Sequence, residues 1–224
     1  MCRRKEAHRS RSNLEYKTCF VLINLSFQLS SLLKVFELSL SCLKEIIMAK
    51  IGIFFGTDTG NTRRIAKDIQ TLLGTELAAK QVNIRTASVD DLLKYDTLIL
   101  GTPTYGEGEL PGLSNGTSTE SWAEFLPKLA GYDFSGKTVA IYGLGNQKGY
   151  AKDFVSAMIF LHDSFTLCGA TLLGASSTDG YTFKQSKAVV DGQFVGLALD
   201  QENQKDLTPS RLSEWLESLQ TAWA

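Results

Sequence analysis

Three short apolar runs, each ending in a glycine or a turn, constrain the fold of this chain more than any other feature. They are "KIGIFF" (50–55), "DTLILG" (96–101) and "KTVAIYG" (137–143). Runs of this kind are typical of strands that are buried on both faces. Helical patterns lie between and after them, at 61–73, 120–130, 150–167 and 209–222. The alternation of strands and helices predicts an α/β fold in which helices cover both faces of a parallel sheet.

The later part of the chain adds detail to this outline. The third helical pattern places one stripe of residues on the same face, namely Phe154, Val155, Met158, Ile159, His162 and Phe165. The last pattern begins with "LTPS", which supplies a Thr or Ser cap with a proline near the first turn. The stretch 176–200 is β-rich and indicates an insertion near the last strand.

Charge is distributed unevenly along the chain. The whole chain has a net charge of −1, but residues 1–47 hold 8 Lys/Arg and 4 Asp/Glu, a net of +4. Residues 48–224 therefore hold 15 Lys/Arg and 20 Asp/Glu, a net of −5. An acidic body disfavours nucleic acid as a partner and favours a basic protein. Cys168 is the only cysteine of this body, so it forms no internal disulfide there and nothing indicates secretion.

The first 47 residues differ in character from the rest. They open with a basic segment and continue with a leucine- and serine-rich one, but no small-residue cleavage site follows. Lys34 and Glu37 interrupt the apolar run, so we expect no membrane span. At Met48 the sequence changes to "MAKIGIFFGTDTG", which has the character of a domain start. We interpret 1–47 as an extension outside the fold, either an over-extended start or a targeting peptide, and 48–224 as the functional domain.

The turn "GTDTGNT" (56–62) follows the first predicted strand and opens the first helix. It is not a nucleoside-triphosphate loop, because Asn61 and Thr62 follow Gly60 where that motif has Lys and Ser/Thr. What remains are threonine hydroxyls, an asparagine amide and the N–H groups of a helix start, which attract anions. The turn suits one terminal phosphate held by neutral donors. The alternative is a Thr- or Asp-capped helix without a ligand.

Two further loops follow the next two predicted strands. "TPTYGEGELPG" presents Tyr105 and "GLGNQKGYAKDF" presents Tyr150, each among glycines that let the backbone approach a flat ligand. Because the strands of a parallel sheet all end at the same edge, we expect both loops to lie at the edge of the sheet that also carries the turn 56–62, which we call the phosphate turn. Two aromatic rings from separate loops can sandwich a ring system. Together the three loops predict a pocket for flavin mononucleotide (FMN).

The same strings resemble the flavodoxin family in order and spacing. The resemblance is carried by "GTDTGNT", "TPTYGEGELPGLS", "GLGNQKGY", "STDGYTF" and "FVGLALD" with "ENQ", and it covers essentially all of 48–224. The β-rich insertion is similar to that of long-chain members. The segment "GEGELPGLS…ESWAEFLPKL" is most similar to flavodoxins of nitrogen-fixing bacteria. The implied fold is a flavodoxin-like, doubly wound, five-stranded parallel sheet with helices on both faces and a β-rich insertion near the last strand.

The resemblance implies a set of cofactor-binding residues. The phosphate positions are Thr57, Asp58, Thr59, Gly60, Asn61 and Thr62. The positions on one face of the flavin ring are Pro103, Thr104, Tyr105 and Gly106. Those on the other face are Leu144, Gly145, Asn146 and Tyr150, of which Tyr150 is the stacking tyrosine. Asp179 is implied to lie near the ribityl chain.

Two of these positions depart from the common pattern of long-chain members. Tyr105 stands where many of them have tryptophan, which implies weaker stacking on that face. Asn146 replaces a common aspartate, which removes a negative charge near the pyrimidine edge of the flavin.

The implied function is that of a low-potential one-electron carrier. FMN shuttles between semiquinone and hydroquinone, and takes electrons from a reductase or photosystem-type donor to acceptors such as nitrogenase. The resemblance implies no catalytic acid, base or nucleophile, and no metal. The acidic residues around the loops, Glu107, Glu109, Glu120 and Glu124, are expected to lower the potential and to steer basic redox partners such as a reductase or the nitrogenase iron protein. We expect a cytoplasmic monomer.

Two other classes compete with this interpretation. A flavodoxin-like NAD(P)H–quinone oxidoreductase needs a second substrate site, for which the sequence offers no motif. A receiver-type signalling domain needs clustered acids at the end of the first strand, where this chain has hydroxyl groups.

Overall fold

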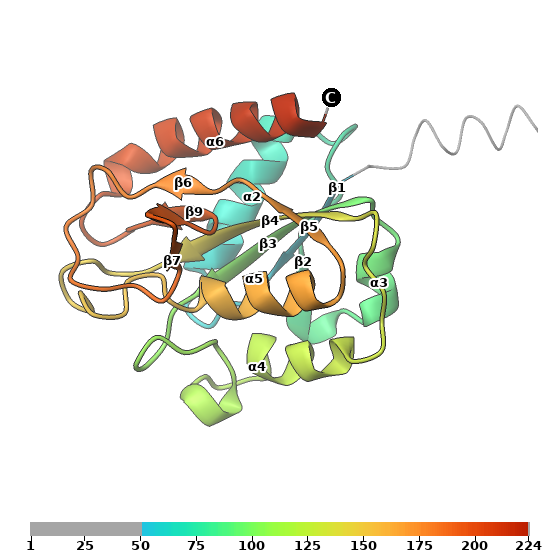
Figure 1. The fold of residues 1–224 in the computed structure, drawn as a ribbon, viewed down its shortest axis with the longest axis horizontal. Coiled ribbons are helices and arrows are strands. Elements are labelled where there is room, and N and C mark those ends of the chain that lie inside the picture. Colours follow the sequence, from blue (N-terminus) through green and yellow to red (C-terminus); the bar gives the residue numbers. More distant parts are fainter. Residues whose placement is uncertain (1–50, 224) are drawn as a thin grey trace, which may run out of the picture. The chain divides into compact units, whose positions relative to one another are not determined.

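The computed structural model describes residues 51–223 and shows a parallel sheet at the centre of the domain (Figure 1). Its strands are β1 (Ile51–Phe55), β2 (Val82–Asn83), β3 (Thr97–Pro103), β4 (Thr138–Leu144) and β5 (Thr171–Leu173), in the order β2-β1-β3-β4-β5. All neighbouring pairs are parallel. The predicted doubly wound, five-stranded α/β fold is confirmed. The extension at 1–47 lies outside the described residues, and its interpretation stays a prediction.

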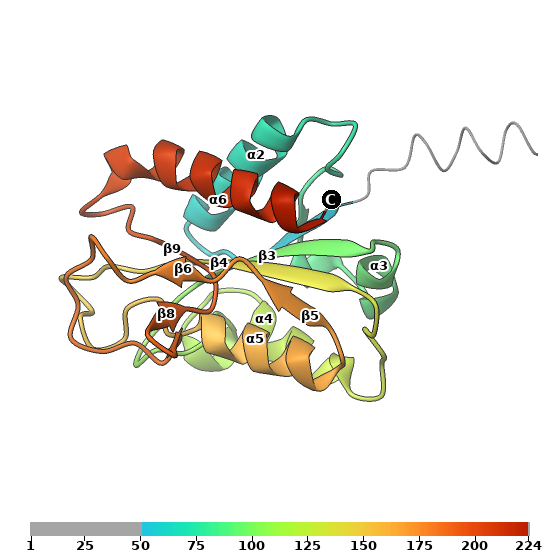
Figure 2. The same cartoon turned by 45° about the horizontal axis from the view of Figure 1, so that its top comes forward.

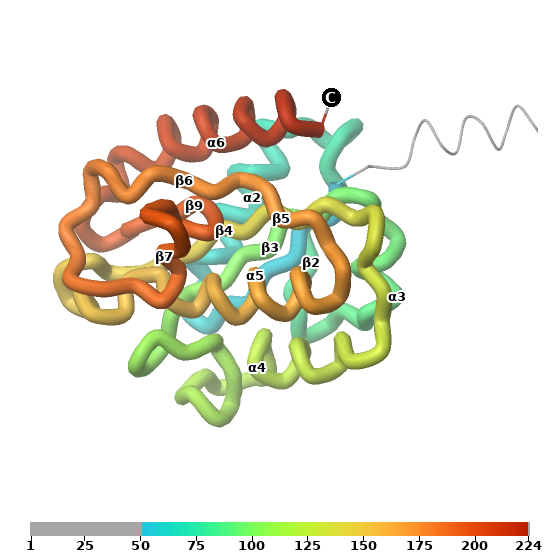
Figure 3. The backbone as a smooth tube through the Cα atoms, in the orientation of Figure 1, coloured from blue at the N-terminus to red at the C-terminus, as the bar shows by residue number. Residues whose placement is uncertain are grey.

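The fifth position of the sheet is occupied by two separate pieces of chain. β5 pairs with the first half of β4, from Thr138 to Ala140, and β9 (Leu197–Leu199) pairs with the second half, from Tyr142 to Leu144. Between the two pieces the backbone leaves the sheet and returns (Figure 3). This excursion carries a small antiparallel sheet of order β6-β8-β7, made of β6 (Ser176–Ser177), β7 (Val189–Val190) and β8 (Gln193–Phe194). The predicted insertion is therefore present, but its predicted range 176–200 also contains β9, a strand of the main sheet.

Helices cover both faces of the sheet (Figure 2). One face carries α2 (Asn61–Leu73) and α6 (Thr208–Trp223). The other carries α3 (Val89–Leu93), α4 (Trp122–Phe125) and α5 (Met158–Leu167). Short 3₁₀ turns complete the described chain at η1 (Ile84–Thr86), η2 (Leu113–Asn115), η3 (Leu126–Leu129) and η4 (Lys205–Leu207).

The apolar runs are continuous because each central strand is buried on both sides. Every residue of β1 is buried, and Ile51, Ile53 and Phe55 pack with α2 and α6. Phe54 points to the opposite face and packs with the cluster of α3, α4 and α5. Successive side chains of a strand point to opposite faces of the sheet. A strand between two helical layers therefore needs apolar residues at both its odd and its even positions.

Two predicted helices are shorter than their patterns. The pattern 150–167 contains α5, but the segment before Met158 is a series of tight turns, and Val155 has a φ of 48°. Of the predicted stripe, Ile159 and His162 are only partly buried. The pattern 120–130 divides into α4 and η3, because Pro127 has no N–H for a further α-helical hydrogen bond.

One short helix was missed, although the sequence carries its start signal. Ser88 and Asp91 form a capping box at the beginning of α3, with Ser88 N–H donating to Asp91 Oδ2 at 2.9 Å. The helix has five residues, too few for a hydrophobic period to show. Within residues 51–223, no helix is both long and apolar enough to cross a membrane.

Candidate functional site

The turn between β1 and α2 leaves the start of the helix open. Gly60 precedes α2 with a φ of 90°, and no side chain caps the helix. The Gly60 N–H donates to Thr57 Oγ1 at 3.0 Å, which folds the turn back on itself. An α-helix begins with N–H groups that have no partner within the helix, and here no side chain takes them. The alternative interpretation, a helix capped by a Thr or Asp side chain and without a ligand, predicted a cap that the structure does not show. The N-terminus of α2 is therefore available to an anion.

Asp58 faces the neighbouring loops within this turn. Ser118 Oγ donates to Asp58 Oδ1 at 3.0 Å. Burial of Tyr105, together with the nearby Asp58 carboxylate, raises the pKa of the Tyr105 hydroxyl, which therefore stays a neutral phenol. Asp58 thus ties the phosphate turn to the segment that holds Ser118, and its charge lies close to the Tyr105 hydroxyl. A carboxylate also repels a phosphate, so its contribution to the site is to organise the turn.

A cavity of about 170 Å³ opens between the two tyrosine loops. It is lined by Thr104, Tyr105, Gly106, Gly145, Asn146, Tyr150 and Asp153. The structure thus brings together the two aromatic loops that the sequence predicted from separate strands. Tyr150 is 63% exposed, so one face of its ring is free for a stacking partner.

Pro103 and Leu144 lie beneath the cavity and do not line it. They are paired as the last residues of β3 and β4. The Thr104 N–H donates to the Leu144 carbonyl at 3.0 Å, which joins the starts of the two loops. Both residues therefore support the pocket from the sheet.

Residues 105–109, which we call the Tyr105 turn, form a tight reversal beside the cavity. Tyr105 N–H donates to the Glu109 carbonyl at 2.9 Å, and Glu109 N–H donates to the Tyr105 carbonyl at 2.7 Å. Gly106 and Gly108 have φ values of 48° and 88°, which glycine adopts without a steric penalty. The tip between these bonds is exposed at Gly106 and Glu107.

The second loop is held by Asn146 and by residues that the sequence analysis did not single out. Asn146 Oδ1 accepts from the N–H groups of Lys148 and Gly149, at 3.1 and 2.7 Å, and from Asn203 Nδ2 at 2.9 Å. The buried Asp200 accepts from Gln147 N–H at 3.1 Å. Burial opposes the ionisation of Asp200, but hydrogen bonds from Asn203 and Gln147 together lower its pKa below the ordinary value. Asp200 and Asn203 lie in the strings "LALD" and "ENQ", which are among those that carry the family resemblance, and this was the sequence signal that could have identified them.

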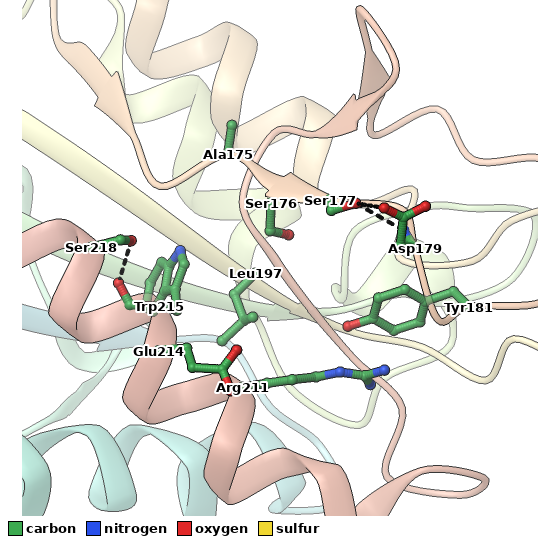
Figure 4. Close-up of a pocket in the computed structure, with 10 residues that line it drawn as sticks. All are labelled: Ala175, Ser176, Ser177, Asp179, Tyr181, Leu197, Arg211, Glu214, Trp215 and Ser218. Carbon is green, nitrogen blue, oxygen red and sulfur yellow. Dashed lines mark hydrogen bonds between the residues drawn. The ribbon is translucent and has the colours of Figure 1, made fainter.

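Asp179 lies at a different cavity. Its Oδ2 accepts from Ser177 Oγ at 2.9 Å, and it lines a cavity of about 290 Å³ between the insertion and α6 (Figure 4). Arg211 and Trp215 of α6 line the same cavity. The structure does not bring Asp179 to the tyrosine pocket, because the chain leaves the sheet after β5 and carries "STDG" toward α6. Its implied place near the ribityl chain stays a prediction.

The acidic residues around the loops have different surroundings. Glu124 accepts from Leu113 N–H at 2.9 Å and from Ser121 N–H at 2.8 Å, so it is part of the local structure. Glu109 Oε1 lies 3.3 Å from Lys187 Nζ. Glu107 and Glu120 are exposed and keep their charge available to a partner.

Tyr181 gives the insertion a pH-dependent contribution to stability. Its hydroxyl donates to the Ala198 carbonyl, and burial raises its pKa from 10.0 to about 12. Because the folded-state pKa lies above the unfolded one, the contribution is present below pH 10 and is lost as pH rises toward 12. The shift of about two pKa units corresponds to about 2.7 kcal/mol.

We therefore predict that Tyr181→Phe costs about 1 kcal/mol of unfolding free energy at neutral pH, through the lost hydrogen bond. As pH rises from 10 to 12, we expect the variant to become the more stable protein. Only the wild-type chain loses stability through this residue in this interval, because its Tyr181 ionises more readily in the unfolded state than in the folded one. Urea unfolding of both proteins at each pH measures this. Two curves that stay parallel across the interval would contradict the burial of this hydroxyl.

The chain resembles known proteins over most of its length. The model of one family, described as flavodoxin, matches residues 53–215. A flavodoxin of Klebsiella pneumoniae is 52% identical over 172 residues, which are 77% of this chain and 97% of that protein. Flavodoxin 1 of Escherichia coli K12 is 42% identical over 175 residues, or 77% of this chain and 93% of that protein. Among solved structures, a Fusobacterium nucleatum flavodoxin bound to flavin mononucleotide has a TM-score of 0.70 at 35% identity, covering 78% of this chain and 99% of that one.

Proposed function

Because this chain belongs to the flavodoxin family, we propose that it is a one-electron carrier that holds one FMN across the three loops described above. The observation that carries the proposal is a shared edge of the sheet. The uncapped start of α2 follows β1, and the two tyrosine loops follow β3 and β4. An anion site and an aromatic slot therefore open on the same side of the molecule, as the phosphate and the ring of one FMN require.

The phosphate end of the proposed site consists of neutral donors. The first N–H groups of α2 and the hydroxyl of the exposed Thr59 are free to donate. Asn61 adds an amide, and Thr57 keeps its own hydroxyl proton after accepting from Gly60. This donor set fits a single terminal phosphate.

The ring end of the proposed site controls the environment of the flavin. FMN supplies the redox chemistry when bound, and the chain orients it and limits its contact with water. Asp153 lines the pocket and Glu107 lies on the adjacent turn. Negative charges at short range disfavour further negative charge on the ligand, which supports a low reduction potential. The proposed role needs no catalytic acid or base.

The finer proposal concerns partners and location. The excess of acids in 48–224, and the exposed Glu107 and Glu120, support docking of a basic reductase as donor and of the nitrogenase iron protein as acceptor. We propose that the chain acts as a cytoplasmic monomer.

The test is an absorbance spectrum during stepwise reduction of the purified full chain. We expect a yellow protein with one FMN per chain that passes through a blue one-electron-reduced form. A colourless protein that cannot be reconstituted with FMN would overturn the proposal. Sustained oxidation of NADPH by the pure protein with a quinone would instead indicate the oxidoreductase alternative. Electron transfer to the iron protein that slows as salt rises would support the acidic docking surface.

Thr59→Val tests the phosphate end. We predict that it weakens FMN binding by about 1.5–3 kcal/mol, because a hydrogen bond to a charged group is lost. Riboflavin has no phosphate, so its affinity should hardly change. Thr71→Val is the matched control, since Thr71 lies on the same helix and donates to the Lys67 carbonyl. Fluorescence titration of the flavin-free proteins measures both ligands, and an equal loss for FMN and riboflavin would contradict the assignment of the turn.

A further inference from the structure

One segment of the insertion contacts both loops of the proposed flavin pocket. The N–H groups of Lys184 and Gln185 donate to the Ala151 carbonyl, at 2.7 and 3.0 Å, beside Tyr150. The Lys187 N–H donates to Ser156 Oγ at 3.0 Å. The side chain of Lys187 then reaches across to the Tyr105 turn. The segment 182–187 therefore spans from one wall of the pocket to the other.

Lys187 makes two contacts with the Tyr105 turn. Its Nζ lies 3.2 Å from the Glu107 carbonyl oxygen and 3.3 Å from Glu109 Oε1. The same Nζ lies 5.8 Å from the centre of the Phe160 ring, so the side chain rests on the surface of α5. The lysine side chain is 43% exposed, and its position comes from these contacts and not from burial.

The turn needs such an anchor because its tip has few restraints of its own. Its two backbone hydrogen bonds join Tyr105 and Glu109, and the peptides between them include two glycines. Glycine restricts the backbone least of all residues, so an unsupported tip samples several arrangements. The bond to the Glu107 carbonyl holds the peptide in the middle of the tip.

We propose that Lys187 is a positioning residue that fixes the Tyr105 turn in the geometry it presents to the flavin ring. This inference rests on the FMN site proposed above. A fixed turn has already lost the conformational freedom that binding would otherwise cost. It would also hold the backbone carbonyls of the tip in place at the edge of the cavity that Gly106 lines, where bound FMN would take up a proton and an electron. Loss of the anchor therefore weakens FMN retention and disfavours the first one-electron reduction.

The experiment compares three variants of the full chain reconstituted with FMN. Lys187→Met removes the donor and the charge but keeps an unbranched apolar side chain. Lys187→Arg restores both donor and charge. Lys184→Met removes the same charge from the same segment, where the exposed lysine contributes only its backbone N–H to the contacts above.

Three measurements apply to each variant: amide hydrogen exchange of the Tyr105 turn, the FMN dissociation rate, and the first one-electron potential. For Lys187→Met we expect about tenfold faster exchange at Glu109 and about fivefold faster FMN release. We also expect about a threefold lower equilibrium constant for the first reduction, which is about 28 mV at 59 mV per tenfold change. Lys187→Arg should stay near wild type, and so should Lys184→Met.

The outcomes separate the anchor from the proposed function. If Lys187→Met and Lys184→Met changed the exchange rate, the FMN dissociation rate and the first potential equally, the proposed anchor would be overturned, because the lost charge alone would then account for the changes. Unchanged exchange in Lys187→Met would overturn it as well. If the wild-type chain does not retain FMN, the proposed function fails, and exchange in the turn alone decides the anchor.

Discussion

Trp122→Ala should lower the free energy of unfolding by about 4 kcal/mol, the largest effect that we predict for a single substitution. The indole is fully buried and packs edge to face on Phe125, with ring centroids 5.7 Å apart. Its Nε1–H donates to the Gly101 carbonyl in the second half of β3, at 2.8 Å. Removing a buried tryptophan loses both the transfer free energy and the packing around the cavity that it leaves.

The same substitution should loosen the phosphate turn. A Cβ atom on Gly56 would lie 2.4 Å from Trp122 Cδ1, so the indole packs directly against the end of β1. Trp122→Phe separates the contribution of packing from that of the hydrogen bond, since it keeps most of the side-chain volume and loses the indole N–H. We expect it to cost about 1 kcal/mol, because the Gly101 carbonyl still accepts from Gly56 N–H at 2.9 Å.

Urea unfolding followed by far-UV circular dichroism measures these costs. Trp223→Ala is the matched control, because Trp223 is only partly buried at the last turn of α6. We expect it to cost about 1 kcal/mol. If Trp122→Ala costs no more than Trp223→Ala, the indole does not join β1, β3 and α4 in the way described.

Gly196→Ala should cost about 3 kcal/mol, at the point where the chain returns to the sheet as β9. An added Cβ would lie 2.2 Å from the Ile141 carbonyl oxygen and 2.9 Å from its carbonyl carbon. Both are backbone atoms in the middle of β4, and they cannot move without disturbing the sheet. The φ of Gly196 is not positive, so the cost comes from crowding and not from backbone strain.

Gly52→Ala provides the comparison for this prediction. Its added Cβ would also be crowded, at 2.5 and 2.7 Å from Tyr95 Cδ2 and Cγ and at 2.9 Å from Cε2 of the buried Phe54, but all three are side-chain atoms. The partly buried Tyr95 can shift more easily than the backbone of a central strand, and we expect a smaller cost of about 2 kcal/mol. Thermal and urea unfolding of both variants test the difference. Equal costs would mean that β9 can move away from β4 without breaking the pairing that the structure shows.

Local sequence patterns were sufficient for the longer elements of the fold. The predicted runs 50–55, 96–101 and 137–143 correspond to β1, β3 and β4 within two residues at each end. The helix predicted at 61–73 coincides with α2. These elements are long enough for burial on one or both faces to impose a visible pattern. β2 and α3, with two and five residues, are too short to show one.

Much of the candidate site followed from the same patterns. Residues that follow parallel strands meet at one edge of the sheet, so the sequence alone brought Tyr105 and Tyr150 to one pocket. It also predicted an anion site at the start of α2, where the structure shows an uncapped helix. These inferences needed only the order of strands and the chemistry of the loops between them.

The tertiary structure alone decided how the loops are supported. Lys187 and Glu107 are 80 positions apart, and Asp58 and Ser118 are 60 apart, so no local pattern relates them. No local pattern shows that the fifth strand is divided into β5 and β9 either. The chain between these two strands leaves the sheet and carries Asp179 to the cavity beside α6. Periodicity reports which face of an element is buried, because burial acts on every turn or pair of residues. Which distant side chain reaches which carbonyl depends on how the elements pack, and that is determined only when the whole chain has folded.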